Sequence, residues 1–194
     1  MRTIFRGAVN PDLNPAATFP AWLAAARAGE ASGFSAIYGW LGPEVKRFAV
    51  GRGARDPEAI TNDAFVAAFR RLGDFDGDAS GFRSWVYAIA RNGLIDAYRA
   101  DQRRVGMTND EGTEPAVEAS AEDLALAGLG AGRATELLAS LTDAQRDVIV
   151  CRVVNGLTLE ETADAVRRPV TAVKRLQARA LSSLRQKISD EGVS

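Results

Sequence analysis

The sequence has no histidine and only one cysteine, Cys151. Histidine is the commonest metal ligand and the usual general base near neutral pH, so its absence argues against a zinc site and against most acid–base enzymes. A lone cysteine cannot form an intrachain disulfide, which is typical of proteins in a reducing cytoplasm. We interpret Cys151 as a buried structural thiol, with oxidation sensing as the alternative.

Long apolar runs and strand patterns are also missing. No segment reaches the roughly 18 to 20 apolar residues of a membrane-spanning helix. Residues 1–30 lack the charged and then apolar pattern of a signal peptide. Alternating β-branched runs are scarce, whereas Ala, Leu, Arg and Glu recur at helical spacing. The sequence therefore predicts an all-α protein of the cytoplasm, without membrane insertion.

A change of composition divides the chain. Residues 105–132 contain no Lys or Arg, and their acids are Asp110, Glu111, Glu114, Glu118, Glu122 and Asp123. Such a composition is typical of a solvated spacer. We therefore predict two small helical domains, at 20–104 and 133–189. A flexible acidic linker at 105–132 joins them, and an N-terminal arm occupies 1–19.

Three local signals suggest helix boundaries in the first domain. Asp56, followed by Pro57 and Glu58, is typical of a helix N-terminus. Pro20 predicts the start of an earlier helix, and the pair Gly42-Pro43 predicts an interruption in the next one. The Gly-rich loop "GDFDGDASG" separates the helix after Asp56 from a long helix that follows Gly81.

The C-terminal segment predicts a helix-turn-helix. Thr158 and Glu161 have the spacing of a capping box, and Arg167, Arg168 and Pro169 form the turn. The second helix has a buried face of Val173, Leu176, Ala180 and Leu184. Its other face carries Thr171, Lys174, Arg175, Gln177, Ala178 and Arg179.

Positive charge is concentrated in this helix although the chain has a formal net charge of −1. From Val166 to Lys187 there is no acid, and the basic residues are Arg167, Arg168, Lys174, Arg175, Arg179, Arg185 and Lys187. Lys and Arg contact phosphates, and residues near the N-terminus of such a helix reach base edges in the major groove. Arg175 and Gln177 carry donors suited to purines. A solvated basic surface is the alternative interpretation.

The first domain combines aromatic rings with cations. Phe75 and Asp78 lie in the Gly-rich loop, and the following helix carries Arg91, Asn92, Arg99, Arg103 and Arg104. Aromatic surface beside positive charge is the combination that binds unpaired bases and their backbone. Phe82 and Trp85 are better explained as core residues. Asn92 lies in the middle of a helix, where an amide is mildly unfavourable, so we expect it to make a polar contact.

Two motifs in this order resemble the extracytoplasmic-function branch of the bacterial RNA polymerase sigma factors. "DAFVAAFRRLGDF", followed by "FRSWVYAIARNGLIDAYR", resembles their region 2. "ELLASLTDAQRDVIVCRVVNGLTLEETADAVRRPVTAVKRLQARALSSLR" resembles their region 4. The two motifs together are far more specific than a lone helix-turn-helix.

The resemblance implies partners and roles. Asn62 and Asp63 would bind the clamp helices of core RNA polymerase. The loop from Phe75 to Gly81, which includes Asp78, would hold a flipped base of the −10 element. Further −10 contacts would come from Arg91, Asn92, Asp96 and Arg99. The −35 element would be read by Arg168, Val170, Thr171, Lys174, Arg175, Gln177 and Arg179.

The same resemblance implies promoter DNA and an anti-sigma factor as further partners. It implies no catalytic site and no cofactor, because phosphodiester synthesis belongs to the polymerase. The sequence departs from the family pattern at Ala59, where an acid is usual, and at Arg167, where glycine is frequent in the turn. Ala172 replaces a polar residue, and Asn62-Asp63 replaces a longer Gln-Glu pair.

Two other functions remain open from the residues alone. A free-standing regulator would use only the C-terminal helices to bind DNA, with residues 20–104 as a sensor or dimerisation domain. The loop at Phe75 and the arginines after Trp85 argue against it. A mimic that sequesters an anti-sigma factor should have lost the basic face, which this chain keeps.

Overall fold

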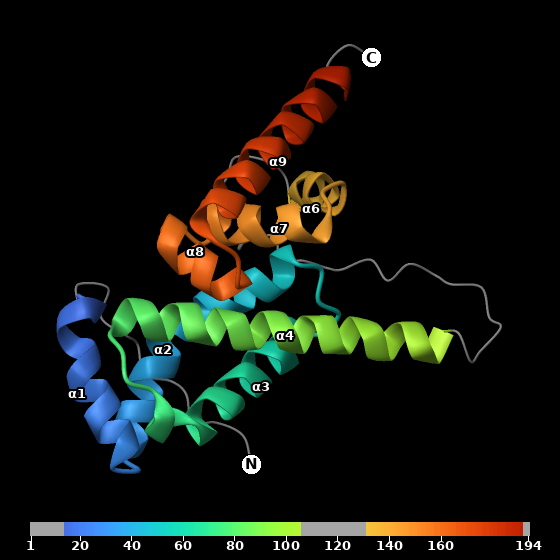
Figure 1. Cartoon of the computed structure of the whole chain (residues 1–194). Helices are drawn as coiled ribbons and strands as arrows, with labels where there is room; N and C mark the ends of the chain where they lie inside the picture. Colours follow the sequence, from blue (N-terminus) through green and yellow to red (C-terminus); the bar gives the residue numbers. More distant parts are fainter. Residues whose placement is uncertain (1–13, 106–130, 192–194) are drawn as a thin grey trace.

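The computed structural model describes residues 14–105 and 131–191 (Figure 1). Within these ranges the chain has helices and no strand, which confirms the all-α prediction. No helix in the described ranges combines the length and apolar character needed to cross a membrane. Residues 1–13 of the predicted arm and nearly all of the predicted linker lie outside the described residues.

Four α-helices build the N-terminal body: α1 (Pro15–Arg27), α2 (Ala31–Gly51), α3 (Pro57–Arg70) and α4 (Ala79–Val105), with a 3-10 turn η1 (Leu72–Asp74). Asp56 caps α3 as predicted, because its side chain accepts a hydrogen bond from the Ala59 amide at 2.8 Å. The helices enclose a core in which the largest buried side chains are Phe19, Ile37, Leu41, Phe48, Phe65, Phe82 and Tyr87.

Two predicted boundaries in this body are wrong. Helix α1 begins at Pro15 rather than Pro20, with Asn14 as its cap. The earlier start buries Phe19 against Trp40 and Phe82. This burial offsets the loss of the backbone hydrogen bond that Pro20 cannot donate. Helix α2 passes through Gly42-Pro43 without interruption. Burial of the helix on both sides of Pro43, at Leu41 and Val45, holds it together.

The C-terminal body contains α6 (Ala131–Ala139), α7 (Asp143–Ile149), the π-helical segment η3 (Val150–Val154), α8 (Leu159–Val166) and α9 (Val170–Glu191). A capping box at Thr142 and Gln145 begins α7. The small core of this body is formed by Val148, Leu157, Val166, Val173 and Ala180. The C-terminal part of α9 extends away from the rest of the molecule (Figure 1).

The two bodies pack against each other. Helix α8 lies across α4, and η3 contacts α2 (Figure 1). Helix α8 is consequently buried on two sides, and Glu160 and Asp164 are its only exposed residues. The sequence predicted two tethered domains but gave no sign of this contact.

Candidate nucleic-acid interface

The helix-turn-helix forms as predicted. The Glu161 amide donates to Thr158 Oγ1 at 3.1 Å, and the Thr158 amide donates to Glu161 Oε2 at 2.7 Å, so the capping box is complete. Arg167 ends α8 in the left-handed conformation, with φ of 52°. The Arg168 amide then donates to the carbonyl of Ala163 at 2.9 Å, as in a helix end that is usually closed by glycine.

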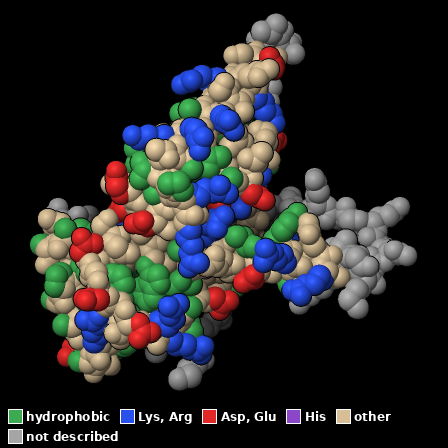
Figure 2. All heavy atoms as spheres, viewed as in Figure 1, with side chains coloured by type: hydrophobic (Ala, Val, Ile, Leu, Met, Phe, Trp, Pro, Cys, Tyr) green, Lys and Arg blue, Asp and Glu red, His purple; other side chains and the backbone are tan. Residues whose placement is uncertain are grey.

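The outer face of α9 presents most of the residues predicted to read duplex DNA. Arg168, Thr171, Lys174, Arg175 and Arg179 are exposed, whereas Val170 and Gln177 are half-buried. Basic side chains follow α9 and continue over the middle of the molecule (Figure 2). Arg152 Nε donates to Gln177 Oε1 at 3.4 Å, so this amide oxygen is engaged within the protein.

The loop of the first domain is held closely to the core. The Phe75 ring stacks on Trp85 with a centroid distance of 5.3 Å and an interplanar angle of 13°. Arg27 anchors the loop by donating to the carbonyls of Leu72 and Phe75. Asp78 Oδ1 accepts from the Gly81 amide at 2.8 Å and thereby caps α4. Phe75 is half-buried, whereas Asp76, Gly77 and Asp78, which follow it, are exposed.

The other residues predicted for −10 contacts lie along α4. Asn92 is half-buried, while Asp96 and Arg99 are exposed and 3.8 Å apart as an ion pair. Tyr98, which precedes Arg99 on the same helix, is 62% exposed. Arg91 points elsewhere, since its Nε donates to Asp147 Oδ2 of the C-terminal body at 2.6 Å.

The predicted polymerase-binding pair lies on the exposed side of α3. Asn62 and Asp63 both face solvent, and Tyr38 of α2 donates its hydroxyl proton to Asn62 Oδ1 at 2.9 Å. Val66, one turn further along α3, is 47% exposed. Burial raises the pKa of Tyr38 and the negative charge of Glu58 adds to that rise, so this hydroxyl stays protonated as a donor. The face thus combines an acid, an amide and an apolar side chain.

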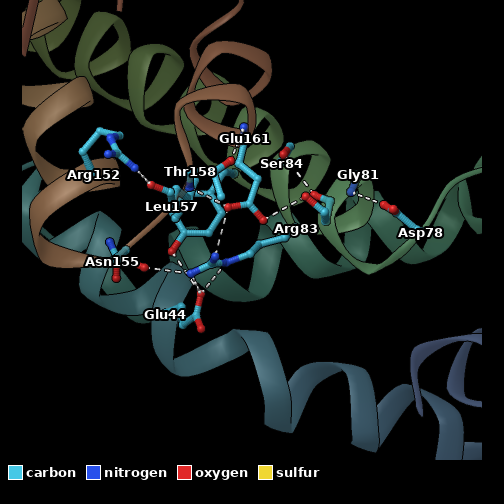
Figure 3. Close-up of polar contacts among 12 residues, drawn as sticks. Glu44, Asp78, Gly81, Arg83, Ser84, Arg152, Asn155, Leu157, Thr158 and Glu161 are labelled. Carbon is cyan, nitrogen blue, oxygen red and sulfur yellow. Dashed lines mark hydrogen bonds and ion pairs between the residues drawn. The ribbon is translucent and has the colours of Figure 1, made fainter. Parts of the chain in front are cut away.

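Arg83 connects the two bodies (Figure 3). Its Nε donates to Glu44 Oε2 at 2.9 Å, its Nη1 to Glu161 Oε2 at 3.2 Å and its Nη2 to the carbonyl of Asn155 at 2.7 Å. Burial lowers the pKa of Arg83, but the negative charges of Glu44 and Glu161, the hydrogen bond to Glu44 and the nearby Tyr87 together more than offset this, and the net shift is upward. Burial and Glu44 raise the pKa of the adjacent Tyr87.

Comparison with known proteins gives two family matches. The model described as Sigma-70 region 2 matches residues 37–104, and the model described as Sigma-70 region 4 matches residues 137–186. The first matched stretch contains the first motif identified above, and the second contains the second motif except its first residue, Glu136.

Curated relatives agree with these matches. The chain is 31% identical over 169 residues to the ECF RNA polymerase sigma factor BldN of Streptomyces coelicolor, covering 86% of this chain and 64% of BldN. It is 36% identical over 132 residues to the ECF RNA polymerase sigma factor ShbA of Streptomyces griseus, covering 66% of this chain and 69% of ShbA.

Two solved structures share the fold. CnrH in complex with the cytosolic domain of CnrY matches with a TM-score of 0.65 and 24% identity, covering 88% of this chain and 96% of CnrH. The sigma factor RpoE in complex with the anti-sigma factor NepR from Bartonella quintana matches with a TM-score of 0.64 and 19% identity. That match covers 78% of this chain and 94% of RpoE.

Proposed function

This chain belongs to the extracytoplasmic-function branch of the bacterial RNA polymerase sigma factors, and from that premise we propose that it directs core RNA polymerase to promoters. In this proposal the N-terminal body engages the polymerase and the −10 element, and α9 reads the −35 element. The chain acts in the cytoplasm as a specificity subunit, and the polymerase performs the chemistry.

The observation that carries the proposal is the outer face of α9. Its N-terminal half exposes Thr171, Lys174 and Arg175 together, while Val173 and Ala180 on the opposite face are fully buried. A helix held in this way presents cations and a hydroxyl to a major groove. A simple solvated helix would not need a complete capping box and a closed left-handed turn to fix its angle against α8.

The N-terminal body supplies the second half of the argument. Exposed Tyr98 and Arg99 on α4 offer a stacking surface and a cation to an opened strand. Asn62 and Asp63 form a separate face on α3, which we assign to core polymerase. A free-standing regulator would need neither surface, and residues 37–104 match a sigma region rather than a sensor.

We also propose an anti-sigma factor as a partner. Both solved structures described above are complexes: CnrH with the cytosolic domain of CnrY, and the sigma factor RpoE with the anti-sigma factor NepR. A two-body sigma fold offers such a partner the same basic and acidic surfaces that polymerase and DNA would use, so an anti-sigma factor would act by competition.

Run-off transcription with purified core polymerase on a pool of genomic promoters tests the proposal. Reversing the charge of Lys174 and Arg175 to Glu should abolish −35-dependent transcripts while polymerase binding survives. The matched control reverses Arg185 and Lys187, which lie further along the same helix. If the unmodified chain neither binds core polymerase nor selects any start site, the proposed function is wrong.

A further inference from the structure

The loop between η1 and α4 has a defined conformation that is built around one ring. Phe75 stacks on Trp85, and Gly77 lies against the tip of the Phe75 ring. A β-carbon at Gly77 would lie 2.8 Å from Phe75 Cζ, which is closer than side chains pack, so the backbone of the loop runs directly past the ring. The exposed residues of the loop are thus held in place from below.

The exposed segment 76–78 is anchored on both sides. On its C-terminal side, Asp78 caps α4 by accepting from the Gly81 amide at 2.8 Å. On its N-terminal side the anchor comes from another helix. Arg27, in the last turn of α1, donates from Nη2 to the carbonyl of Phe75 and from Nε to the carbonyl of Leu72 at 3.4 Å. One side chain of α1 therefore holds two carbonyls at the start of the loop.

Helix α1 supports the ring as well as the backbone of the loop (Figure 1). Phe19 of α1 is 1% exposed and meets Phe75 edge-on, with a centroid distance of 6.3 Å and an interplanar angle of 85°. Arg27 and Phe75 also line an open hollow of about 630 Å³, so a group bound beside the loop lies next to its anchor. Helix α1 precedes residues 37–104, the stretch that matches Sigma-70 region 2.

The chemistry of arginine suits this anchoring role. A guanidinium is a planar fork of donors, so it reaches two carbonyl oxygens at once. Arg27 is exposed, and an exposed arginine contributes little to the stability of the whole fold. Its two hydrogen bonds instead fix the first residue of the loop. A base that enters the loop then meets a preformed site, which lowers the cost of ordering the loop on binding.

We propose that Arg27 is a positioning residue for −10 recognition. It holds the loop in the conformation that distinguishes one base from another, and it acts through the two carbonyls rather than by touching the DNA. The proposal rests on the proposed function, in which this loop captures a base of the −10 element. Helix α1 thereby becomes part of the −10 apparatus, although it lies outside the matched region.

Hydrogen exchange followed by mass spectrometry tests the anchor in the free chain. The amides of Asp74 and Phe75 are hydrogen-bonded within the turn that begins the loop, so their exchange reports its opening. Arg27→Ala should speed the exchange of a peptide that covers both amides at least about fivefold. Arg70→Ala removes an exposed arginine from the last turn of α3 and is the matched control, with an expected change of less than about twofold.

Holoenzyme assembled from core RNA polymerase and the full chain tests base discrimination. The probe is a single strand of about 20 nucleotides with a randomised centre, and the strands that the holoenzyme retains are sequenced. A mismatched base costs a specific complex roughly 5- to 150-fold in affinity, so the parent chain should enrich particular bases.

The expected effect of Arg27→Ala on this enrichment is local. At one position the enrichment should fall at least about fivefold, because the loop no longer selects its base. At the other positions it should stay within about twofold, because the remaining −10 contacts lie on α4. Arg70→Ala should keep the whole preference of the parent chain. A residue that only stabilised the fold would not produce a loss confined to one position.

Arg27→Lys separates positioning from direct contact with DNA. Lysine keeps the positive charge, but its single nitrogen does not reproduce the fork. The variant should therefore also lose more than about twofold of the enrichment at that position, and its loop should exchange faster than in the parent chain. Thermal unfolding followed by circular dichroism should place Arg27→Ala and Arg27→Lys within about 2 °C of the parent chain, since Arg27 is exposed.

The outcomes distinguish the proposal from the proposed function. The proposal is overturned by unchanged exchange in Arg27→Ala, by faster exchange with an unchanged base preference, or by a uniform loss of enrichment with a lowered thermal midpoint. Full base preference in Arg27→Lys also overturns it, because the charge rather than the fork would then be what matters. A parent holoenzyme that prefers no base contradicts the proposed function, and the proposal falls with it. Hydrogen exchange still shows in that case whether Arg27 anchors the loop.

Discussion

Glu161 of the helix-turn-helix contacts Arg83 of the N-terminal body at 3.2 Å while it also completes the capping box with Thr158. One carboxylate therefore starts α8 and attaches it to α4. Glu161→Gln should keep the cap and lose the charge, whereas Glu161→Ala loses both. We expect losses in unfolding free energy of about 1 kcal/mol and about 2–3 kcal/mol, respectively.

Thermal unfolding followed by circular dichroism measures the difference. Arg83 keeps Glu44 as a partner in both variants, so neither should cost as much as a buried charge left alone. Glu160→Ala, at the exposed neighbouring position, is the control and should change stability by less than about 0.5 kcal/mol. Equal losses for Gln and Ala would show that the cap contributes nothing.

The exposed face of α3 gives a prediction about polymerase. Asn62→Ala combined with Asp63→Ala should weaken binding to core polymerase about tenfold, because two polar contacts are lost at an exposed site. Competition binding with labelled core polymerase measures this change. Glu30→Ala combined with Ser32→Ala removes a similar exposed pair at the start of α2 and should have no effect. Unchanged affinity of the first variant would assign polymerase binding to another surface.

Asn92 gives a prediction about strand opening. Its amide is half-buried in the middle of α4, where Asn is unfavourable for the helix. If it contacts the opened −10 strand, Asn92→Ala should reduce open-complex formation more than duplex binding. Permanganate footprinting of the melted strand, on a promoter selected by the parent chain, measures open-complex formation. A gel shift measures duplex binding. Equal effects on both would argue for a purely structural role of Asn92.

Local sequence signals predicted local structure well. The caps at Asp56 and Thr158 are confirmed because a cap requires only residues within one turn of the helix start. The errors at Pro20 and Pro43 have one physical cause. Proline disfavours a helix interior by about 3 kcal/mol, but burial of the surrounding apolar side chains exceeds that cost, and such burial depends on the whole fold.

The site was harder to predict than the helices. The exposed face of α9 follows directly from helical periodicity, so Lys174 and Arg175 could be placed from sequence. Arg91 could not, because its partner Asp147 is 56 residues away and on the other body. Phe75 was chosen as an aromatic in a Gly-rich loop, but that pattern does not distinguish a ring that faces solvent from one that stacks on Trp85.

Cys151 gives a prediction about pH. Burial and the nearby Asp147 raise the pKa of its thiol well above the ordinary value of 9.0. The neutral thiol therefore stabilises the fold below about pH 9, and this contribution is lost as the pH rises further, because the unfolded chain then releases its proton first. Ellman's reagent at pH 8 should leave the native protein unmodified and react at once in denaturant. Rapid reaction of the native protein would favour the oxidation-sensing role.

The turn at Arg167 gives a prediction about stability. Arg167 has φ of 52° and ψ of 51°, a left-handed conformation that costs a residue with a β-carbon about 1–2 kcal/mol. Glycine adopts it without strain but loses more backbone entropy on folding. Arg167→Gly should therefore raise the unfolding free energy by about 0.5–1 kcal/mol.

Arg168→Gly, at the next residue, is the matched control for this change. Arg168 is also an exposed arginine but does not have a positive φ, so glycine there brings only the entropic loss and should destabilise the protein. Urea unfolding of both variants measures whether each substitution raises or lowers the free energy of unfolding. If Arg167→Gly destabilises as much as Arg168→Gly, the left-handed conformation of Arg167 is not strained. In that case the positive charge that Arg167 adds to the proposed DNA interface has no cost in stability.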